Sequence, residues 1–179
     1  MLRVLGICAL TLCSAQSLAE DWWVEKSEAY VMATLSKQSF YDTDNTNAGA
    51  LFGMKDIYPN GWLVAGELEV RFPSGDELEQ ATGFNQNYSF DVNVPLGRRF
   101  TLSDSINLDA YGLIGYSTSR LERVEEVEDL ATRFTINGVK WGLGSDLNIS
   151  DWVVGVRYAI ANLDGSKDDN LTLSIGTRF

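Results

Sequence analysis

Hydrophobic and polar residues alternate along the last ten positions of the chain, residues 170–179. Successive side chains of a β-strand point to opposite faces, so this stretch predicts a strand with one apolar and one polar face. The apolar face carries Leu171, Leu173, Ile175 and Phe179. Because a free chain end frays, a strand that runs to the last residue is expected to be paired with another strand.

The same two-faced pattern recurs in eight segments of the chain. The predicted strands span residues 29–38, 48–58, 62–72, 88–100, 106–118, 135–148, 152–163 and 170–179. No segment keeps a helical period, and none has the apolar length of a membrane helix. The sequence therefore predicts an all-β chain that forms one domain.

Short and long connections alternate between the predicted strands. Tight turns rich in turn-forming residues occupy residues 59–61, 102–105 and 150–151, and longer polar links occupy residues 40–47, 73–87, 120–134 and 164–169. Short turns on one rim and long loops on the other are typical of an outer-membrane barrel. We expect an eight-stranded antiparallel up-and-down transmembrane β-barrel with both termini on the short-turn rim.

Bulky apolar residues share one parity of the strands, and small or charged residues share the other. A soluble lipocalin-like barrel also alternates, with its apolar face turned inward. Residues such as Phe52, Trp141 and Leu143 would overfill an eight-stranded barrel, whose interior is just wide enough to be filled by side chains. Glycines alternating with a few long charged chains fit that interior. The apolar face is therefore predicted to point outward, which is tolerable only in lipid.

Aromatic residues cluster at the ends of the predicted strands. Two aromatic girdles, one at each membrane interface, are expected of a barrel in the outer membrane. The predicted interface residues are Tyr58, Trp62, Phe100, Trp152 and Phe179 at the short-turn ends, with Phe72 and Tyr116 near the long-loop ends.

The charge of the chain limits its partners. Lys and Arg number 14 and Asp and Glu 25, which gives a formal net charge of −11. A nucleic-acid partner would need a basic face, so we expect no nucleic acid to bind.

The N-terminal residues predict a secretory signal peptide. Arg3 supplies a positive start, residues 4–12 an apolar run and residues 17–19 a small-x-small cleavage site. Cleavage would remove residues 1–19 and leave residues 20–179 as the barrel domain.

Both cysteines of the chain, Cys8 and Cys13, lie inside the predicted signal peptide. The exported part is therefore expected to contain neither a disulfide nor a thiol ligand.

These features resemble the small outer-membrane β-barrel family that includes the OmpA transmembrane domain, OmpX and the opacity-type, porin-like proteins. The resemblance implies a place in the outer membrane of a Gram-negative bacterium, in contact with lipid and lipopolysaccharide, with both termini in the periplasm. It also implies that Leu171, Leu173, Ile175 and Phe179 form the terminal-strand signal read by the barrel-assembly machinery. Thr177 departs from this signal, because an apolar residue is usual there.

Charged residues recur on the parity that is predicted to face the barrel lumen. They are Lys55, Glu67, Glu69, Arg71, Asp91, Arg99, Asp109, Lys140, Asp146, Arg157 and Arg178. Buried charges persist when they are paired, so one hypothesis is an ion-pair network that fills and specifies the interior. The other is a narrow ion path that opens when Glu67 or Glu69 exchanges partners with a facing base.

The residue types present argue against catalysis. Barrels that modify lipid A use a histidine as general base beside a serine, an aspartate or a water, and this chain contains no histidine. Without histidine or an exported cysteine, a transition-metal site is not expected either. We therefore predict no catalytic residue, no metal and no cofactor.

Two of the predicted loops are acidic, at residues 76–79 and 122–129. They are interpreted either as solvated loops or as a surface for Ca²⁺ or another ligand, since carboxylate oxygens suit a hard cation. The sequence as a whole predicts a barrel with a structural or adhesin-like surface-interaction role. A low-conductance channel is the first alternative, and a lipid-modifying enzyme the second.

Overall fold

The computed structural model describes residues 24–40, 43–75, 77–123 and 132–179. The predicted signal peptide, residues 1–19, lies outside the described residues. The strands are β1 (Lys26–Phe40), β2 (Thr43–Ile57), β3 (Trp62–Pro73), β4 (Phe84–Ser103), β5 (Ile106–Arg123), β6 (Thr132–Ile149), β7 (Trp152–Leu163) and β8 (Ser166–Arg178), and a short helix, α2 (Glu77–Thr82), precedes β4. No helix among these residues is long and apolar enough to cross a membrane.

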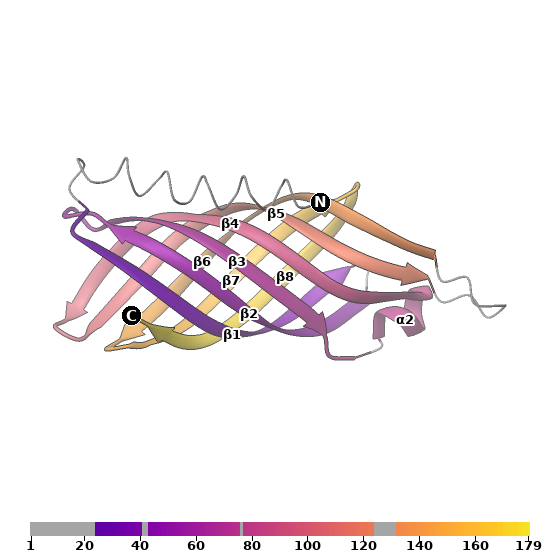
Figure 1. Ribbon diagram of the computed structural model, residues 1–179, viewed down its shortest axis with the longest axis horizontal. Helices are drawn as coiled ribbons and strands as arrows, with labels where there is room; N and C mark the ends of the chain where they lie inside the picture. The colour runs from indigo at the N-terminus through magenta and orange to yellow at the C-terminus, as the bar shows by residue number, and fades with distance from the viewer. Residues whose placement is uncertain (1–23, 41–42, 76, 124–131) are drawn as a thin grey trace.

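The eight strands form a closed barrel in which each strand pairs with its neighbour in sequence, and β8 pairs with β1 (Figure 1). The closing pair runs antiparallel from Tyr30 opposite Arg178 to Phe40 opposite Asp168. Backbone hydrogen bonds from Ala29 N to Phe179 O (3.0 Å) and from Phe179 N to Ala29 O (2.9 Å) hold the last residue. The predicted fold class is thus confirmed, and closure leaves no unpaired sheet edge.

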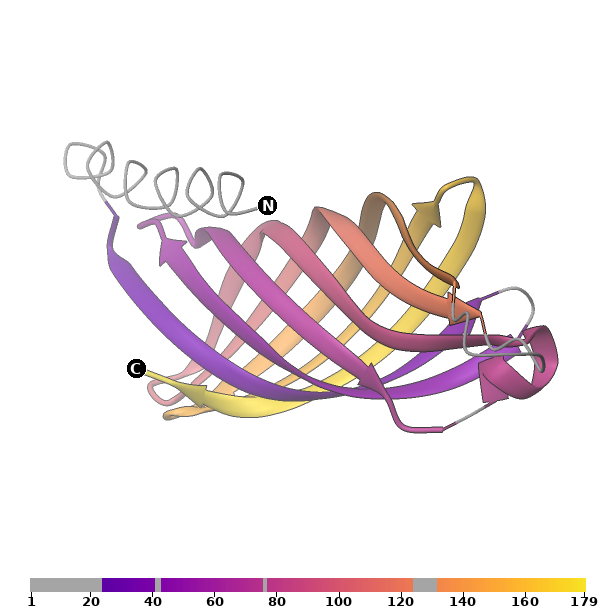
Figure 2. The same ribbon diagram turned by 45° about the vertical axis from the view of Figure 1, so that its right-hand side comes forward.

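The short turns lie where the sequence predicts them, at one end of the barrel. The turn after β2 closes through hydrogen bonds from Gly61 N to Tyr58 O (2.8 Å) and from Tyr58 N to Trp62 O (2.9 Å). Gly61 adopts a φ of 81°, which glycine tolerates without strain. Phe179 lies at this end too, opposite the end that carries α2 (Figure 2).

The long links at the other end are shorter than predicted, because the strands extend into them. The predicted link 40–47 is mostly strand, since β2 already begins at Thr43, and the link 164–169 shrinks to a turn before Ser166. Polar side chains such as Gln38 and Asn45 face inward here and are buried. Both faces are therefore polar at this end, so the hydrophobic alternation stops although the backbone pairing continues.

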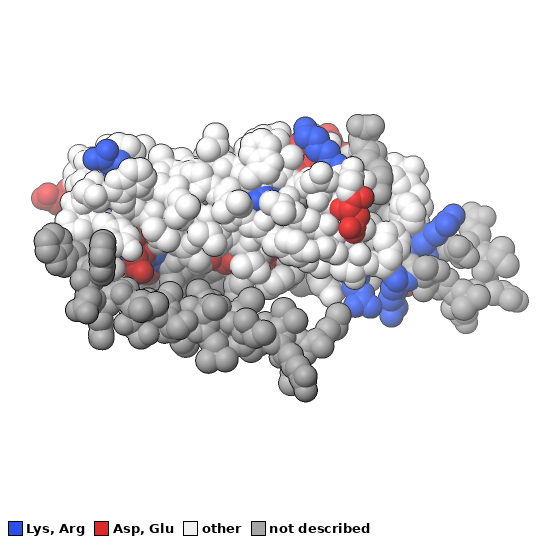
Figure 3. Space-filling model, turned by 90° about the horizontal axis from the view of Figure 1, so that it is seen from above, with Lys and Arg blue, Asp and Glu red and all other residues white. Residues whose placement is uncertain are grey.

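The bulky apolar residues lie on the outside of the barrel, as the volume argument predicts. Leu143 is 70% exposed, and Trp141 and Phe52 are also exposed. The middle of the face seen in Figure 3 is mostly uncharged, and its charged side chains gather towards the two ends. Such a surface suits the hydrocarbon core of a bilayer.

Two glycines make room for tyrosine rings inside the barrel. Gly53 lies directly opposite Tyr30, and Gly144 lies directly opposite Tyr111. A Cβ atom at Gly53 would collide with the Tyr30 ring, and one at Gly144 would come within 2.7 Å of the Tyr111 hydroxyl oxygen. The Tyr30 and Tyr111 rings therefore pack directly against the backbone of Gly53 and Gly144 inside the barrel.

Apolar side chains inside the barrel were not predicted. One cluster contains Tyr30, Met32, Leu51 and Val153, and a second contains Ile57, Leu63, Tyr111, Leu113 and Ala159. A third lies at the end that carries α2 and contains Leu78, Leu121, Ile136, Ala161 and Leu163, with Phe134 packed against it. The interior is therefore part ionic and part hydrophobic.

Candidate functional site: the charged interior of the barrel

All eleven charged residues that the sequence predicts for the lumen face the interior. Nine are buried as whole residues, and the side chains of Arg99 and Arg178, near the short-turn rim, are 8% and 11% exposed. They lie on the seven strands from β2 to β8, and they fall into three groups along the barrel. Their functional role stays a prediction.

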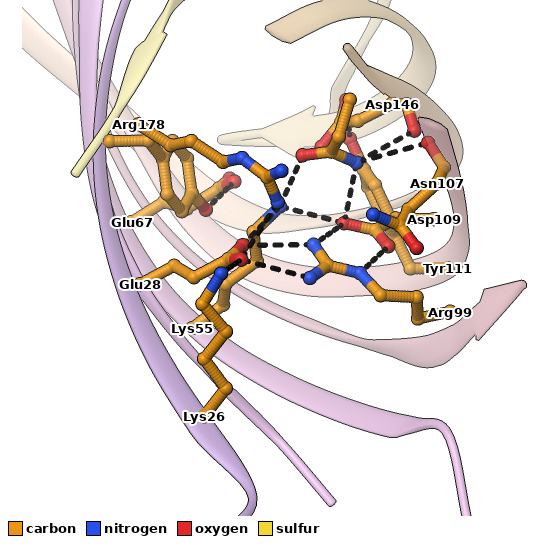
Figure 4. A network of polar contacts seen from close by, with 12 residues as sticks. Lys26, Glu28, Lys55, Glu67, Arg99, Asn107, Asp109, Tyr111, Asp146 and Arg178 are labelled. Carbon is orange, nitrogen blue, oxygen red and sulfur yellow. Dashed lines mark hydrogen bonds and ion pairs between the residues drawn. The ribbon is translucent and has the colours of Figure 1, made fainter. Parts of the chain in front are cut away.

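Arg99 joins two carboxylates from different strands in the group at the short-turn end. Its Nη1 and Nη2 donate to the two oxygens of Glu28 at 3.0 and 2.9 Å. Its Nε and Nη2 donate to the two oxygens of Asp109 at 2.6 and 2.8 Å. Figure 4 shows these three side chains pointing toward one another from β4, β1 and β5. The planar guanidinium suits this doubly bidentate geometry, which Lys could not supply.

Two further cations complete this group. Lys55 Nζ donates to Asp109 Oδ2 at 2.7 Å, and Arg178 Nη1 donates to Glu28 Oε1 at 2.7 Å. Arg178 Nε also donates to the backbone oxygen of Ser150 at 2.7 Å. The last residue of β8 is therefore fixed both to β1 and to the turn before β7.

The sequence analysis missed Glu28, although it is central to this group. The first strand was predicted to begin at residue 29, whereas β1 begins at Lys26. Glu28 has the same parity as the buried Tyr30 and Met32. Extending the alternation by one step would have found it.

The middle group is built around the ion pair of Glu67 and Arg157. Arg157 Nη1 and Nη2 donate to the two carboxylate oxygens at 2.6 and 3.0 Å. Tyr30 Oη donates to the same carboxylate at 2.6 Å. The Arg157 guanidinium also lies 5.4 Å from the centre of the Tyr111 ring, within the range of a cation–π interaction. Tyr111 in turn donates to Asp146 at 2.9 Å.

The third group lies nearer the end that carries α2 and is built around Asp91. This carboxylate accepts hydrogen bonds from Arg71 Nη2 (2.8 Å), Lys140 Nζ (2.6 Å) and Ser117 Oγ (2.5 Å). Glu69 lies beside the same two cations, 3.7 Å from Lys140 Nζ and 4.0 Å from Arg71 Nε. The Glu69 oxygens have no hydrogen-bond partner among the described residues.

The chemistry of these groups is that of ion pairing. Removing one member of a buried ion pair leaves the other charge uncompensated, which destabilises the fold by several kcal/mol. Both members of each pair are therefore needed together. Within the described part of the chain, no three acidic side chains gather in a way that could hold a metal ion.

The predicted interface aromatics lie in or next to the strands, and Tyr116 lies well inside β5 because this strand extends to Arg123. At the short-turn end, Trp62 and Trp152 start strands, Tyr58 and Phe179 follow strands, and Phe100 lies near the end of β4. All of the predicted set except Tyr58 are exposed. Leu171, Leu173 and Ile175 of β8 are exposed on the outer face as well. Membrane anchoring and recognition by the assembly machinery stay predictions for these residues.

The two acidic loops are described only in part, because Asp76 and residues 124–131 lie outside the described residues. In the first, Glu79 accepts a hydrogen bond from Asn85 at 2.9 Å. In the second, Glu122 accepts hydrogen bonds from Arg133 Nε at 3.1 Å and Asn87 at 3.2 Å, which hold its pKa below the ordinary value. Part of this acidic charge is therefore matched within the chain.

Comparison with known families gives one match over nearly the whole chain. The family model described as "Outer membrane protein beta-barrel domain" matches residues 5–179. No curated protein matches this chain in sequence.

Solved structures with the same fold come from several bacteria. Ail of Yersinia pestis, in complex with the heparin analogue sucrose octasulfate, has 17% identity and a TM-score of 0.57, with 86% of this chain and 99% of that chain covered. Neisserial surface protein A has 7% identity and a TM-score of 0.65, covering 85% and 95%. The N-terminal barrel domain of Pseudomonas aeruginosa OprF has 10% identity and a TM-score of 0.53, covering 86% and 100%.

Proposed function

The chain belongs to the family of outer membrane protein beta-barrel domains, and we propose that it has a structural and surface-interaction role in the outer membrane of a Gram-negative bacterium. The observation that carries the structural role is the closed interior. Arg99, Glu28 and Asp109 join β4, β1 and β5 at one end, and Glu67 and Arg157 join β3 and β7 in the middle. An interior occupied by such pairs supports a filled barrel rather than a pore.

The surface-interaction role assigns ligand binding to the rim that carries α2. The name of the Ail structure reports a heparin analogue bound to that protein. This chain has a formal net charge of −11, so we propose a cationic partner for its acidic loops, such as a divalent cation or a basic segment of another protein. Outer-membrane lipid, lipopolysaccharide and the barrel-assembly machinery are the other proposed partners.

Planar-bilayer recording tests the structural role. The purified protein should migrate faster on a gel before heating than after heating, which shows a folded barrel, and should then give no discrete openings in the bilayer. Openings from a preparation that passes the gel test would overturn the structural role.

One observation favours a second candidate, a narrow channel. The Glu69 carboxylate lies within 4.0 Å of Arg71 and Lys140 without a hydrogen bond to either, while both cations are bound to Asp91. Glu69 is therefore placed as an alternative partner for two cations, and an exchange would rearrange the charges across the interior. If openings occur, Glu69→Gln should change their frequency, whereas Asp169→Asn on the outer face should not.

Both chain ends and the short turns are proposed to face the periplasm. A cysteine at Asp104, in the turn after β4, should be protected in intact cells from a reagent that cannot cross the membrane. A cysteine at Gln80, which is exposed on α2, should react. The opposite pattern would reverse the proposed orientation.

The proposal includes no catalytic activity. Pure refolded protein should leave lipopolysaccharide and phospholipid unchanged, as followed by mass spectrometry of the lipids. Turnover that depends on folded protein would favour the lipid-modifying alternative.

A further inference from the structure

The inner face of the barrel changes from polar to apolar at the end that carries α2. The third apolar cluster lies here and combines Leu78 of α2 with Leu121 of β5, Ile136 of β6, and Ala161 and Leu163 of β7. All five are buried. We call this cluster the apolar cap.

The helix contributes to the cap through one side chain. Leu78 is 2% exposed, whereas Gln80 and Ala81 are exposed and Glu79 and Thr82 are half-buried. Gly83 follows the helix with a φ of +73°, and a Cβ atom at this position would have no neighbour within 4 Å. Figures 1 and 2 show α2 at the mouth of the barrel, at the end opposite the C-terminus. A helix of six residues with one buried leucine has little to hold it in place.

Buried polar groups lie along the barrel on the inner side of the cap. Side-chain atoms of Thr34, Ser36, Asn45, Asn93, Asn170 and Ser174 have no hydrogen-bond partner among the described residues. Each of these residues is nine-tenths or more buried. Buried hydroxyl and amide groups are almost always hydrogen-bonded, so water is the partner that their chemistry requires. The interior beneath the cap is therefore lined by polar groups that bind water.

We propose that α2 is a plug for this end of the barrel, with Leu78 as its seal. While Leu78 is seated against Leu121, Ile136 and Leu163, the cap separates the hydrated interior from the external solution. When the helix lifts, water and small polar solutes enter the interior from that side. This inference concerns access to the interior and does not depend on the proposed surface-interaction role.

Cysteine accessibility tests the plug in the folded protein. Ser36→Cys places a thiol beneath the cap and breaks no hydrogen bond between the described residues, because the Ser36 hydroxyl has no partner there. The exported part of the sequence has no other cysteine. The probe is a small, positively charged methanethiosulfonate added to the purified protein refolded in detergent micelles, and the measurement is its rate of reaction.

Leu78→Asp should raise the rate at the Ser36→Cys thiol by about tenfold or more, because burial of a leucine favours the seated state by at least that factor. Ala81→Asp puts the same charge on an exposed position of the same helix and should leave the rate unchanged. A slow rate in all three backgrounds, or an equal rise with both aspartates, would overturn the proposal.

A variant on the barrel wall tests the cap without changing the sequence of the helix. Leu121→Ser opens the same contact from β5 and should also raise the rate. A difference between unheated and heated gel mobility shows that each variant is a folded barrel. If folded Leu121→Ser protects the thiol as well as the parent protein does, Leu78 is not the seal.

Discussion

Loss of the Glu67 carboxylate should destabilise the barrel strongly. Glu67 accepts three hydrogen bonds, two from Arg157 and one from Tyr30, and so connects β3 to β7 and β1. The two charged residues are 3% and 2% exposed, so water cannot replace a lost partner easily. Glu67→Ala would leave the Arg157 guanidinium buried without its counter-ion.

The size of the effect follows from that unpaired charge. Removing one member of a buried ion pair costs about 3–5 kcal/mol, whereas replacing both members with apolar residues of similar volume is often close to neutral. We therefore expect Glu67→Ala to lower the free energy of unfolding by about 4 kcal/mol. The double variant Glu67→Leu with Arg157→Met should lose less than Glu67→Ala alone.

Urea unfolding in lipid vesicles, followed by tryptophan fluorescence, measures these free energies. Asp169→Ala is the matched control, because it breaks the exposed pair with Lys167 on the outer face and should cause no measurable loss. A loss from Glu67→Ala no larger than that of the control would contradict the reasoning. So would a double variant that is less stable than Glu67→Ala.

Three further predictions test the two faces of the wall and its last residue. Leu143→Arg in the apolar belt should lower the free energy of unfolding in vesicles by about 2–4 kcal/mol, and Leu102→Arg near the short-turn rim by about 0–1 kcal/mol. Equal losses from the two variants would refute the assigned depths. Gly53→Ala should lower the free energy of unfolding by about 1–3 kcal/mol, because the new methyl group collides with the Tyr30 ring. Gly112→Ala should be tolerated in the same assay, because a Cβ atom at Gly112 lies 3.9 Å from its nearest neighbour. Phe179→Ala should slow assembly in cells, seen as unfolded protein in pulse-chase gels, while refolding into vesicles changes little; unchanged assembly would remove Phe179 from the signal.

The strand count, the closure and the orientation of the two faces could be predicted from the sequence. Each depends on a period of two, and that period is strong wherever one face meets lipid and the other meets the interior. Trp141 and Lys140 are neighbours of this kind, one exposed and the other buried. The same rule assigned all eleven charged residues to the inner face.

The pairing of those charges could not be predicted, and neither could the limits of the strands at the end that carries α2. Glu28 contacts Arg99 and Arg178, which are 71 and 150 residues away in the chain, and only the strand register brings them together. The beginning of β2 was missed because Asn45 and Asn47 are polar residues that face inward between other polar residues. Leu78 was interpreted as part of an acidic loop, and no local pattern shows that it is buried.

The register of the barrel is specified from the inside. Residues on the outer face, such as Leu143, meet acyl chains that accept any apolar side chain, so a shift of two residues along a strand would change little there. The same shift of β4 would carry Arg99 away from Glu28 and Asp109 and would leave its guanidinium unpaired inside the barrel. An unpaired buried charge costs several kcal/mol, whereas the apolar outer face distinguishes little between the two registers. The charged interior therefore selects one register among those that the apolar surface allows, and this selection holds whether or not the interior ever opens.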